Sequence, residues 1–276
     1  MCYPSFMITP RPCGSFLELD EHGHVIKKAS PDLIPHKWKG LVREVTRLYG
    51  SYFGSNLHSV WLRGSVANGQ AEDGAADLDT FAYLIEEADW PTGIDAEIRE
   101  LQTRHPHCTW IETIAMPVAE LEHDRVWARI IKTQAVCLHG EDIGSRIPPH
   151  SLRDMIHYSR YLRFNLEKKL PLFLAEDAGD PRELCRTCSW TAKLLLRSLY
   201  ETIMLKEGRW TNDLWPCYER FSAHHAGREM QTMELLQLCL NPVADEKRLA
   251  KAVAAFVPWI YDEVRAQLGV ESDATY

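Results

Sequence analysis

Short apolar runs separated by polar turn residues mark the first half of the chain. Residues 60–62 form one such run and residues 81–85 form another, and Gly, Ala and Asn are frequent in the loop between them. Runs of this length between turn residues are typical of buried strands. We therefore expect a pair of strands within residues 60–85.

The rest of the first half alternates between helical and strand-like patterns. Between residues 36 and 49, apolar residues recur every three or four positions, which predicts an amphipathic helix that ends at Gly50 and Gly54. Residues 108–116 are β-branched and aromatic and lie between prolines, which predicts another strand. We also expect a small hairpin, a helix, a stretch with one or two helices, and a turn, at residues 17–26, 95–104, 118–138 and 140–144.

Strand patterns disappear after Pro148 and Pro149. Asp180 before a proline is a typical helix N-cap, and Gly208 suits a helix C-cap. Helical periodicity covers four stretches, at residues 151–175, 181–207, 212–239 and 244–268. The composition change near residue 148 therefore divides an α/β half from an all-helical half.

Composition narrows the class of protein only moderately. The chain has 276 residues, 45% of them apolar, and a net charge of −8, which suits one large or two moderate globular domains. This acidic balance argues against a dedicated nucleic-acid binder. The chain has no run of 18 apolar residues and no secretory signal, so we expect a cytoplasmic protein with no membrane partner. Its eight scattered cysteines are expected to be buried thiols rather than disulfides.

Candidate chemistry gathers around the first predicted strand pair. Asp77 and Asp79 are two residues apart at the start of a strand, so their carboxylates point to the same face. Their repulsion is tolerable if a divalent cation lies between them. The upstream Gly64-Ser65 turn offers backbone N–H groups and a hydroxyl, which suit a phosphate. This combination indicates phosphoryl or nucleotidyl transfer. The alternative is a hairpin loop in which Gly and Asp are merely turn residues.

Leu62, Gly64-Ser65 and Asp77-Leu78-Asp79, with eleven residues between the two polar groups, resemble the signature of the nucleotidyltransferase superfamily. The layout is similar to that of aminoglycoside and streptomycin-type nucleotidyltransferases. The resemblance implies an α+β fold, in which a mixed sheet with flanking helices is followed by a C-terminal helical bundle. We expect a catalytic domain at residues 1–148, with an N-terminal extension at 1–32, and a helical domain at 149–276.

The resemblance also implies roles for individual residues. Asp77 and Asp79 would bind Mg²⁺, while Gly64 and Ser65 would hold the β- and γ-phosphates of ATP. Glu112, the one acid inside the strand predicted at 108–116, would be a further metal ligand or the general base. The alternative interpretation is that Glu112 is a solvated residue on an edge strand.

The helical half is expected to supply cations for the triphosphate. Lys193 and Arg197 are four residues apart and share a helix face, although a solvent-facing basic stripe is the alternative. The helix around Leu194–Tyr200 is similar to one in streptomycin-type adenylyltransferases. That family has a second phosphate-directed lysine further on, where this chain has residues 210–213, Trp-Thr-Asn-Asp.

Three functions remain open on the sequence. The first is transfer of a nucleoside monophosphate, AMP from ATP, to a hydroxyl of a small acceptor such as an aminoglycoside, as in antibiotic resistance. The second keeps this chemistry but modifies tRNA or a partner protein, as in toxin–antitoxin systems. The third is an inactive nucleotide-binding module. The preferred base is undetermined, because stacking tolerates any base.

Overall fold

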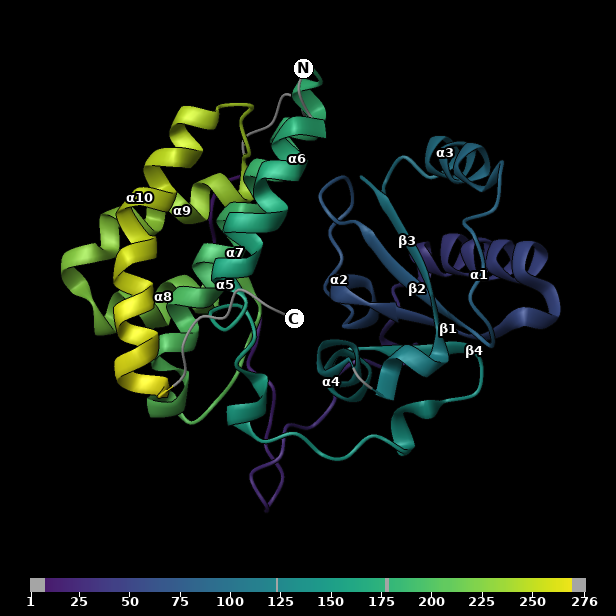
Figure 1. Cartoon of the computed structure of the whole chain (residues 1–276), viewed down its shortest axis with the longest axis horizontal. Helices are drawn as coiled ribbons and strands as arrows, with labels where there is room; N and C mark the ends of the chain where they lie inside the picture. Colours follow the sequence, from purple (N-terminus) through teal and green to yellow (C-terminus); the bar gives the residue numbers. More distant parts are fainter. Residues whose placement is uncertain (1–7, 123, 177–178, 270–276) are drawn as a thin grey trace. The chain divides into compact units, whose positions relative to one another are not determined.

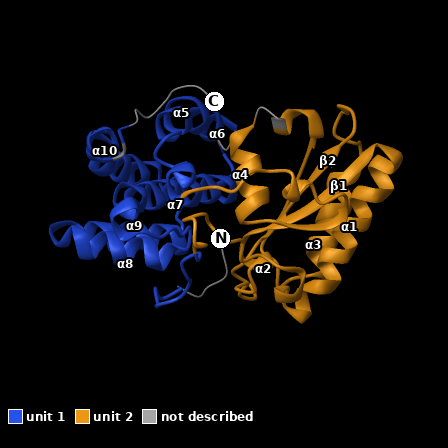
Figure 2. Ribbon diagram, turned by 90° about the horizontal axis from the view of Figure 1, so that it is seen from below, with its two compact units in different colours: residues 1–18, 152–276 blue, residues 19–151 orange. Residues whose placement is uncertain are grey.

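The protein was analysed as a computed structural model that describes residues 8–122, 124–176 and 179–269. The chain divides into two compact units, one at residues 19–151 and the other at residues 152–276 together with residues 1–18 (Figure 2). We refer to them as the sheet unit and the helical unit and describe each by itself.

A mixed four-stranded sheet forms the centre of the sheet unit, in the order β3-β2-β1-β4 (Figure 1). Strand β1 is antiparallel to both β2 and β4, whereas β2 and β3 are parallel. The strands are Leu57–Arg63 (β1), Leu78–Leu84 (β2), Ile111–Pro117 (β3) and Val136–Gly140 (β4). The mixed sheet and the helices of the second half confirm the α+β fold class. The expected hairpin at residues 17–26 is reduced to one bridge between Leu19 and Val25.

Strand β4 corrects the sequence prediction, which placed a helix and a turn in this region. Its apolar stretch spans only Val136 to Leu138, too short to distinguish from the end of the preceding helix. The strand depends on pairing with β1, for example Leu62 with Val136. A tertiary contact of this kind is not visible in a local sequence pattern.

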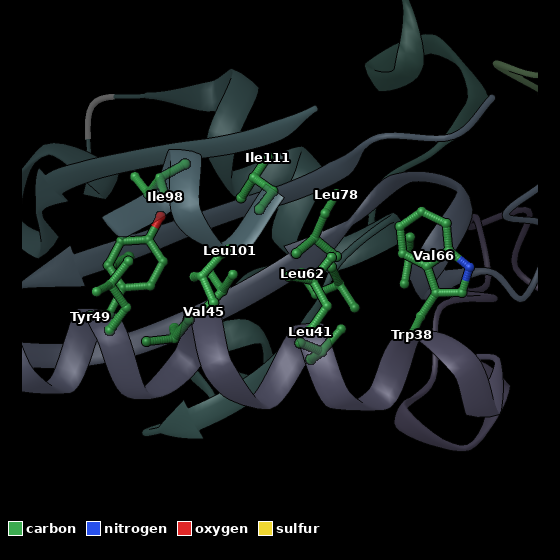
Figure 3. Close-up of a cluster of buried hydrophobic side chains, with 14 of the residues drawn as sticks. Trp38, Leu41, Val45, Tyr49, Leu62, Val66, Leu78, Ile98, Leu101 and Ile111 are labelled. Carbon is green, nitrogen blue, oxygen red and sulfur yellow. The ribbon is translucent and has the colours of Figure 1, made fainter. Parts of the chain in front are cut away.

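Helices cover both faces of the sheet. Helices α1 (Lys39–Phe53) and α3 (Ile94–Arg104) share one core with alternate residues of β1 and β2 (Figure 3). Helix α4 (Arg125–Thr133) packs on the opposite face against Trp61 and Phe81. Short helical turns complete the unit at Pro31–Leu33, His36–Trp38, Gly54–Asn56, Gly64–Ala67 (α2), Val118–Glu122 and Ile143–Ser145. Because strand residues alternate between faces, Arg63 and Asp79 lie on the α4 side.

Two glycines expected to end the first helix behave differently. Gly50 lies inside α1, so that part of the prediction is wrong. Gly54 is the C-cap and has φ of +51°, a conformation that costs glycine little.

The helical unit is built around α7 (Pro181–Glu207), whose predicted bounds are confirmed. Asp180 accepts a hydrogen bond from the Arg182 N–H at 2.8 Å, and Gly208 ends the helix with φ of +66°. The other helices are Leu162–Phe164 (α5), Leu170–Glu176 (α6), Leu214–His224 (α8), Glu229–Leu240 (α9) and Glu246–Glu263 (α10). Shorter turns lie at Leu152–Met155, Asn165–Lys169, Ala226–Arg228 and Val264–Leu268.

Two predicted helices are interrupted. The stretch 151–175 contains a non-helical segment before α5, and the stretch 212–239 divides into α8 and α9 at His225. The first interruption has a physical cause in the buried carboxylate of Glu201, which accepts hydrogen bonds from the backbone N–H groups of residues 157–159. Those N–H groups therefore do not need helical partners.

Residues 15–17 are attached to the segment 210–213 of the same unit. The Leu17 N–H donates to the Trp210 carbonyl at 2.9 Å, and the Ser15 N–H donates to Asp213 Oδ2 at 2.7 Å. Trp210 is 1% exposed, so it packs in the core. The segment that replaces the lysine of the resembled family therefore has a structural task here.

In the part of the chain that the structure describes, no helix combines the length and the apolar character needed to cross a membrane. The seven described cysteines are all free thiols, and five of them are buried.

Candidate functional site

Three strand ends bring Arg63, Asp79 and Glu112 side by side. Arg63 is the last residue of β1 and pairs with Asp79 near the start of β2. Asp79 in turn pairs with Glu112 near the start of β3. The parallel pairing of β2 and β3 thus aligns the two carboxylates, and the antiparallel pairing of β1 brings a guanidinium to them. Glu112 was expected near Asp79, and the register places it there.

Arg63 Nη2 joins the two carboxylates. It lies 2.5 Å from Glu112 Oε2 and 3.3 Å from Asp79 Oδ1. The side chains of Arg63, Asp79 and Glu112 are 30%, 16% and 36% exposed. The three groups are therefore partly shielded from water yet remain accessible from solution. We call them the carboxylate–arginine cluster.

Gly64 is required at its position by two independent features. Its φ is +77°, which favours glycine. A Cβ on this residue would lie 2.1 Å from Asp79 Oδ2 and 3.2 Å from Asp79 Cγ. The backbone of residue 64 thus approaches the Asp79 carboxylate closely only because no side chain intervenes. The approach seen here is to Asp79, and the expected contact of Gly64 with a phosphate stays a prediction.

Ser65 lies next to the cluster in α2 and is half-buried. Its carbonyl accepts from the Gln70 N–H at 2.8 Å, which closes the turn after β1. Within the described ranges, its hydroxyl has no hydrogen-bond partner. The hydroxyl can therefore donate to a ligand.

Asp77 stands immediately before β2 and is half-buried. Strand parity puts it on the same side as Asp79. The segment around it is fixed to the start of β3, because Leu78 N–H donates to the Trp110 carbonyl at 2.8 Å and Thr109 N–H donates to the Ala76 carbonyl at 2.9 Å. The position of the two aspartates is thus set by backbone pairing.

An aromatic wall supports the cluster from the α4 side. Arg63 Cζ lies 6.0 Å from the centre of the Trp127 ring, and the Trp127 ring centre lies 4.7 Å from that of Phe81. Phe81 stacks on Trp61 with an interplanar angle of 10°. The Trp127 ring therefore favours a cation beside it.

Cys108 is the thiol whose titration the aspartates influence. Burial raises the pKa of Cys108 to about 12, and the charges of Asp77 and Asp79 act in the same direction. This thiol stays protonated at neutral pH. It is therefore a packing residue and not a thiolate nucleophile.

The described residues contain no group of three or more His, Cys, Asp or Glu side chains arranged to hold a metal ion. The predicted metal set of Asp77, Asp79 and Glu112 is accordingly not assembled as a ready cage. Asp79 and Glu112 nevertheless fit Mg²⁺, which is commonly bound by one or two carboxylates together with substrate phosphates. A cationic group already lies between them, since Arg63 Nη2 contacts both. The donor set is thus one that attracts a cation.

Lys193 and Arg197 both lie on α7 in the helical unit. Arg197 Nε donates to the Asn212 carbonyl at 2.9 Å, and its Cζ lies 5.2 Å from the centre of the Tyr158 ring. Lys193 is half-buried and has no ion-pair partner among the residues described. Arg197 is therefore held in a defined orientation.

Glu201 holds the segment that contains Tyr158, the residue whose ring lies next to Arg197. This carboxylate is 1% exposed and accepts from the backbone N–H groups of His157, Tyr158 and Ser159 at 2.8, 3.0 and 2.7 Å. It also accepts from the Ser159 hydroxyl at 2.6 Å. Burial raises the pKa of Glu201, and the four donors act against that rise. Glu201 thereby orders the loop that carries Tyr158 under Arg197.

Sequence reasoning gave no role to Arg63 or Glu201. The signal for Arg63 was its place directly before Gly64, at the end of a strand predicted to pair with the strand of Asp79. Using that signal requires the β1–β2 register, which the long loop 64–77 leaves open. Glu201 looked like an ordinary polar residue of a helix.

Known proteins were compared with the chain at three levels. No family profile matches the chain, and no curated protein matches it by sequence. Among solved structures, the chain is similar to a spectinomycin adenyltransferase, AAD(9) from Enterococcus faecialis, crystallised with ATP and spectinomycin. The match has 10% sequence identity and a TM-score of 0.46, and it covers 82% of this chain and 98% of that chain. A likeness of this size assigns neither substrate nor mechanism to this chain.

Proposed function

We propose that this chain is a Mg²⁺-dependent nucleotidyltransferase that moves a nucleoside monophosphate, AMP from ATP, to a hydroxyl of a small acceptor of the aminoglycoside kind. The observation that carries the proposal is the alignment of Gly64, Asp79 and Glu112 at one edge of the sheet. The backbone of Gly64, which carries no side chain, lies there close to the Asp79 carboxylate, and Glu112 is the strand partner of Asp79. This arrangement suits a metal-bound triphosphate.

Each residue has a distinct task in the proposed reaction. Asp79 and Glu112, with Asp77 beside them, would hold Mg²⁺, which when bound offsets the charge that builds on the α-phosphate and on the leaving pyrophosphate. The Ser65 hydroxyl and the backbone at Gly64 would hold the β- and γ-phosphates. The acceptor oxygen forms a bond to the α-phosphorus while the bond to the pyrophosphate oxygen breaks. The acceptor proton passes to a carboxylate, for which Glu112 is the candidate base.

The proposal includes a contribution from the helical unit. Lys193 and Arg197 would add positive charge for the triphosphate. The fixed orientation of Arg197, held by Asn212 and Tyr158, supports this role, since an ordered guanidinium loses less conformational freedom when it binds phosphate.

The test is pyrophosphate release with Mg²⁺, ATP and a panel of hydroxylated acceptors that includes aminoglycosides. We expect release with at least one acceptor, and a loss of about a hundredfold or more in Asp79→Asn. Asp89→Asn removes the same charge from an exposed loop and should retain full activity. Release that is absent with every acceptor, or equal in wild type and Asp79→Asn, contradicts the proposal. Label transfer into total RNA or protein instead would redirect it to a macromolecular acceptor.

A further inference from the structure

The cation that occupies the candidate metal position belongs to the chain itself. Arg63 Nη2 lies 2.5 Å from Glu112 Oε2 and 3.3 Å from Asp79 Oδ1, and these atoms belong to the two carboxylates that the proposed function gives to Mg²⁺. A bound divalent cation would have to share these oxygens with a guanidinium, and two cations at one site repel each other. Arg63 and a metal ion therefore compete.

From this competition we propose that Arg63 is an internal counter-ion, which keeps Asp79 and Glu112 closed to divalent cations until a nucleoside triphosphate draws the guanidinium away. The proposal rests on the proposed function for the identity of the ligand. Guanidinium binds phosphate oxygens through two parallel hydrogen bonds, so a triphosphate offers Arg63 an alternative partner. The triphosphate also brings its own Mg²⁺ to the released carboxylates.

The local structure supports a guanidinium that can leave. The Arg63 side chain is 30% exposed, and Glu112 is 36% exposed, so the pair is open to solvent on one side. Its backbone is fixed at the end of β1 by pairing with Asp79. Movement is thus confined to the side chain, while the carboxylates keep their register.

The arrangement predicts coupling between metal and nucleotide. In the wild type, a divalent cation alone must displace Arg63, so its binding is weak. A nucleotide that engages Arg63 removes that competitor and strengthens metal binding, and the metal strengthens nucleotide binding by the same factor. Without Arg63, the nucleotide still adds phosphate ligands to the metal but no longer removes a competitor, so it strengthens metal binding by a smaller factor than in the wild type.

The experiment measures Mn²⁺ binding by electron paramagnetic resonance of free Mn²⁺, on the full chain, with and without a non-hydrolysable ATP analogue, and a titration of the analogue without protein gives the Mn²⁺ that the analogue binds by itself. We expect Arg63→Gln to bind Mn²⁺ about tenfold more tightly than wild type in the absence of nucleotide. Arg63→Lys, which keeps a charge but not the planar fork, should lie between the two. Arg43→Gln removes an equal charge from an exposed position on α1 and should match wild type. Asp79→Asn combined with Arg63→Gln should abolish the tight binding.

A thermal-shift measurement provides a second readout that does not depend on activity. Arg63→Gln removes the guanidinium that contacts both carboxylates, so it should melt at a lower temperature than wild type in EDTA. Mn²⁺ should restore its melting temperature, by an amount that follows the measured affinity. The wild type should respond much less to the same concentration.

Failure of the inference is distinct from failure of the proposed function. Mn²⁺ binding that is equal or weaker in Arg63→Gln, or absent from both proteins, overturns the counter-ion inference, whatever the enzyme activity. Tighter Mn²⁺ binding in Arg63→Gln, with an analogue that improves the affinity of the wild type by a larger factor than that of the variant, supports it. If wild type transfers nothing to any acceptor while this metal pattern holds, the inference stands and the proposed function falls.

Discussion

Gly64→Ala is the substitution whose cost follows most directly from the geometry of the site. The residue has φ of +77°, and a left-handed conformation costs a non-glycine residue about 1–2 kcal/mol. The new Cβ would lie 2.1 Å from Asp79 Oδ2, so the carboxylate must move by roughly 1 Å or more to reach an ordinary contact distance. Overpacking of this kind costs about 1–3 kcal/mol. The free energy of unfolding should therefore fall by about 2–5 kcal/mol.

Substitutions of two other glycines separate the cost of the backbone conformation from the cost of overpacking. Gly74 has φ of +73°, and a Cβ on this residue would meet no atom within 4 Å, so Gly74→Ala carries the backbone cost alone. Gly50 lies inside α1 with free space around it, so Gly50→Ala should stabilise the chain by about 0.5–1 kcal/mol. Urea unfolding followed by tryptophan fluorescence gives the three values. If Gly64→Ala destabilises the chain no more than Gly74→Ala does, the Cβ contact with Asp79 carries no cost.

Three further predictions concern the helical unit. Glu201→Gln replaces one of the two carboxylate oxygens with an NH2 group that cannot accept, so two of the four donors lose their acceptor; the free energy of unfolding should fall by about 2–4 kcal/mol and at least one amide of residues 157–159 should exchange faster in hydrogen-exchange measurements, whereas unchanged protection of all three would contradict the role of Glu201. Glu207 is bound by Arg220, His224 and Arg209, which hold the pKa of its carboxyl at about 2. Because the pKa is lowered on folding, this contribution to stability, about 2–3 kcal/mol, is complete above the unfolded value near 4.5 and is lost as the pH falls toward 2. The stability difference between wild type and Glu207→Gln should shrink over that range in urea titrations, and a constant difference would contradict this explanation. Arg197→Gln and Lys193→Gln should each weaken ATP binding in calorimetry by about fivefold to tenfold, whereas Arg182→Gln, on an exposed part of the same helix, should not; equal effects of all three would show a general charge effect instead.

Local sequence patterns were sufficient to predict helices and strands whose ends are marked by residues in the sequence itself. Helix α7 has an acidic N-cap at Asp180 and a glycine at 208, and both ends were predicted correctly. The strands around Gly64 and Asp79 were also found, because each is an apolar run next to turn residues. Strand β4 was missed, since it depends on pairing with β1 and not on its own three apolar residues.

The candidate site divides in the same way. Asp79, Glu112 and Gly64 were visible because the chemistry of their residue types is characteristic, and the structure aligns them at one sheet edge. Arg63 was given no role, because its contact with Asp79 depends on the register of β1 and β2, and a long loop separates these two strands. The link from Glu201 to Tyr158 and Arg197 depends on tertiary contacts of a buried carboxylate, for which a helical sequence gives no signal.

The central claim, transfer of a nucleoside monophosphate, is tested most directly by following two phosphate labels in parallel. ATP labelled at the α-phosphate or at the γ-phosphate is incubated with Mg²⁺, the full chain and an acceptor that supports pyrophosphate release. We expect the α-label on the acceptor and the γ-label in pyrophosphate, and we expect Asp79→Asn to abolish both. Transfer of the γ-label to the acceptor, or no transfer of either label, would contradict it.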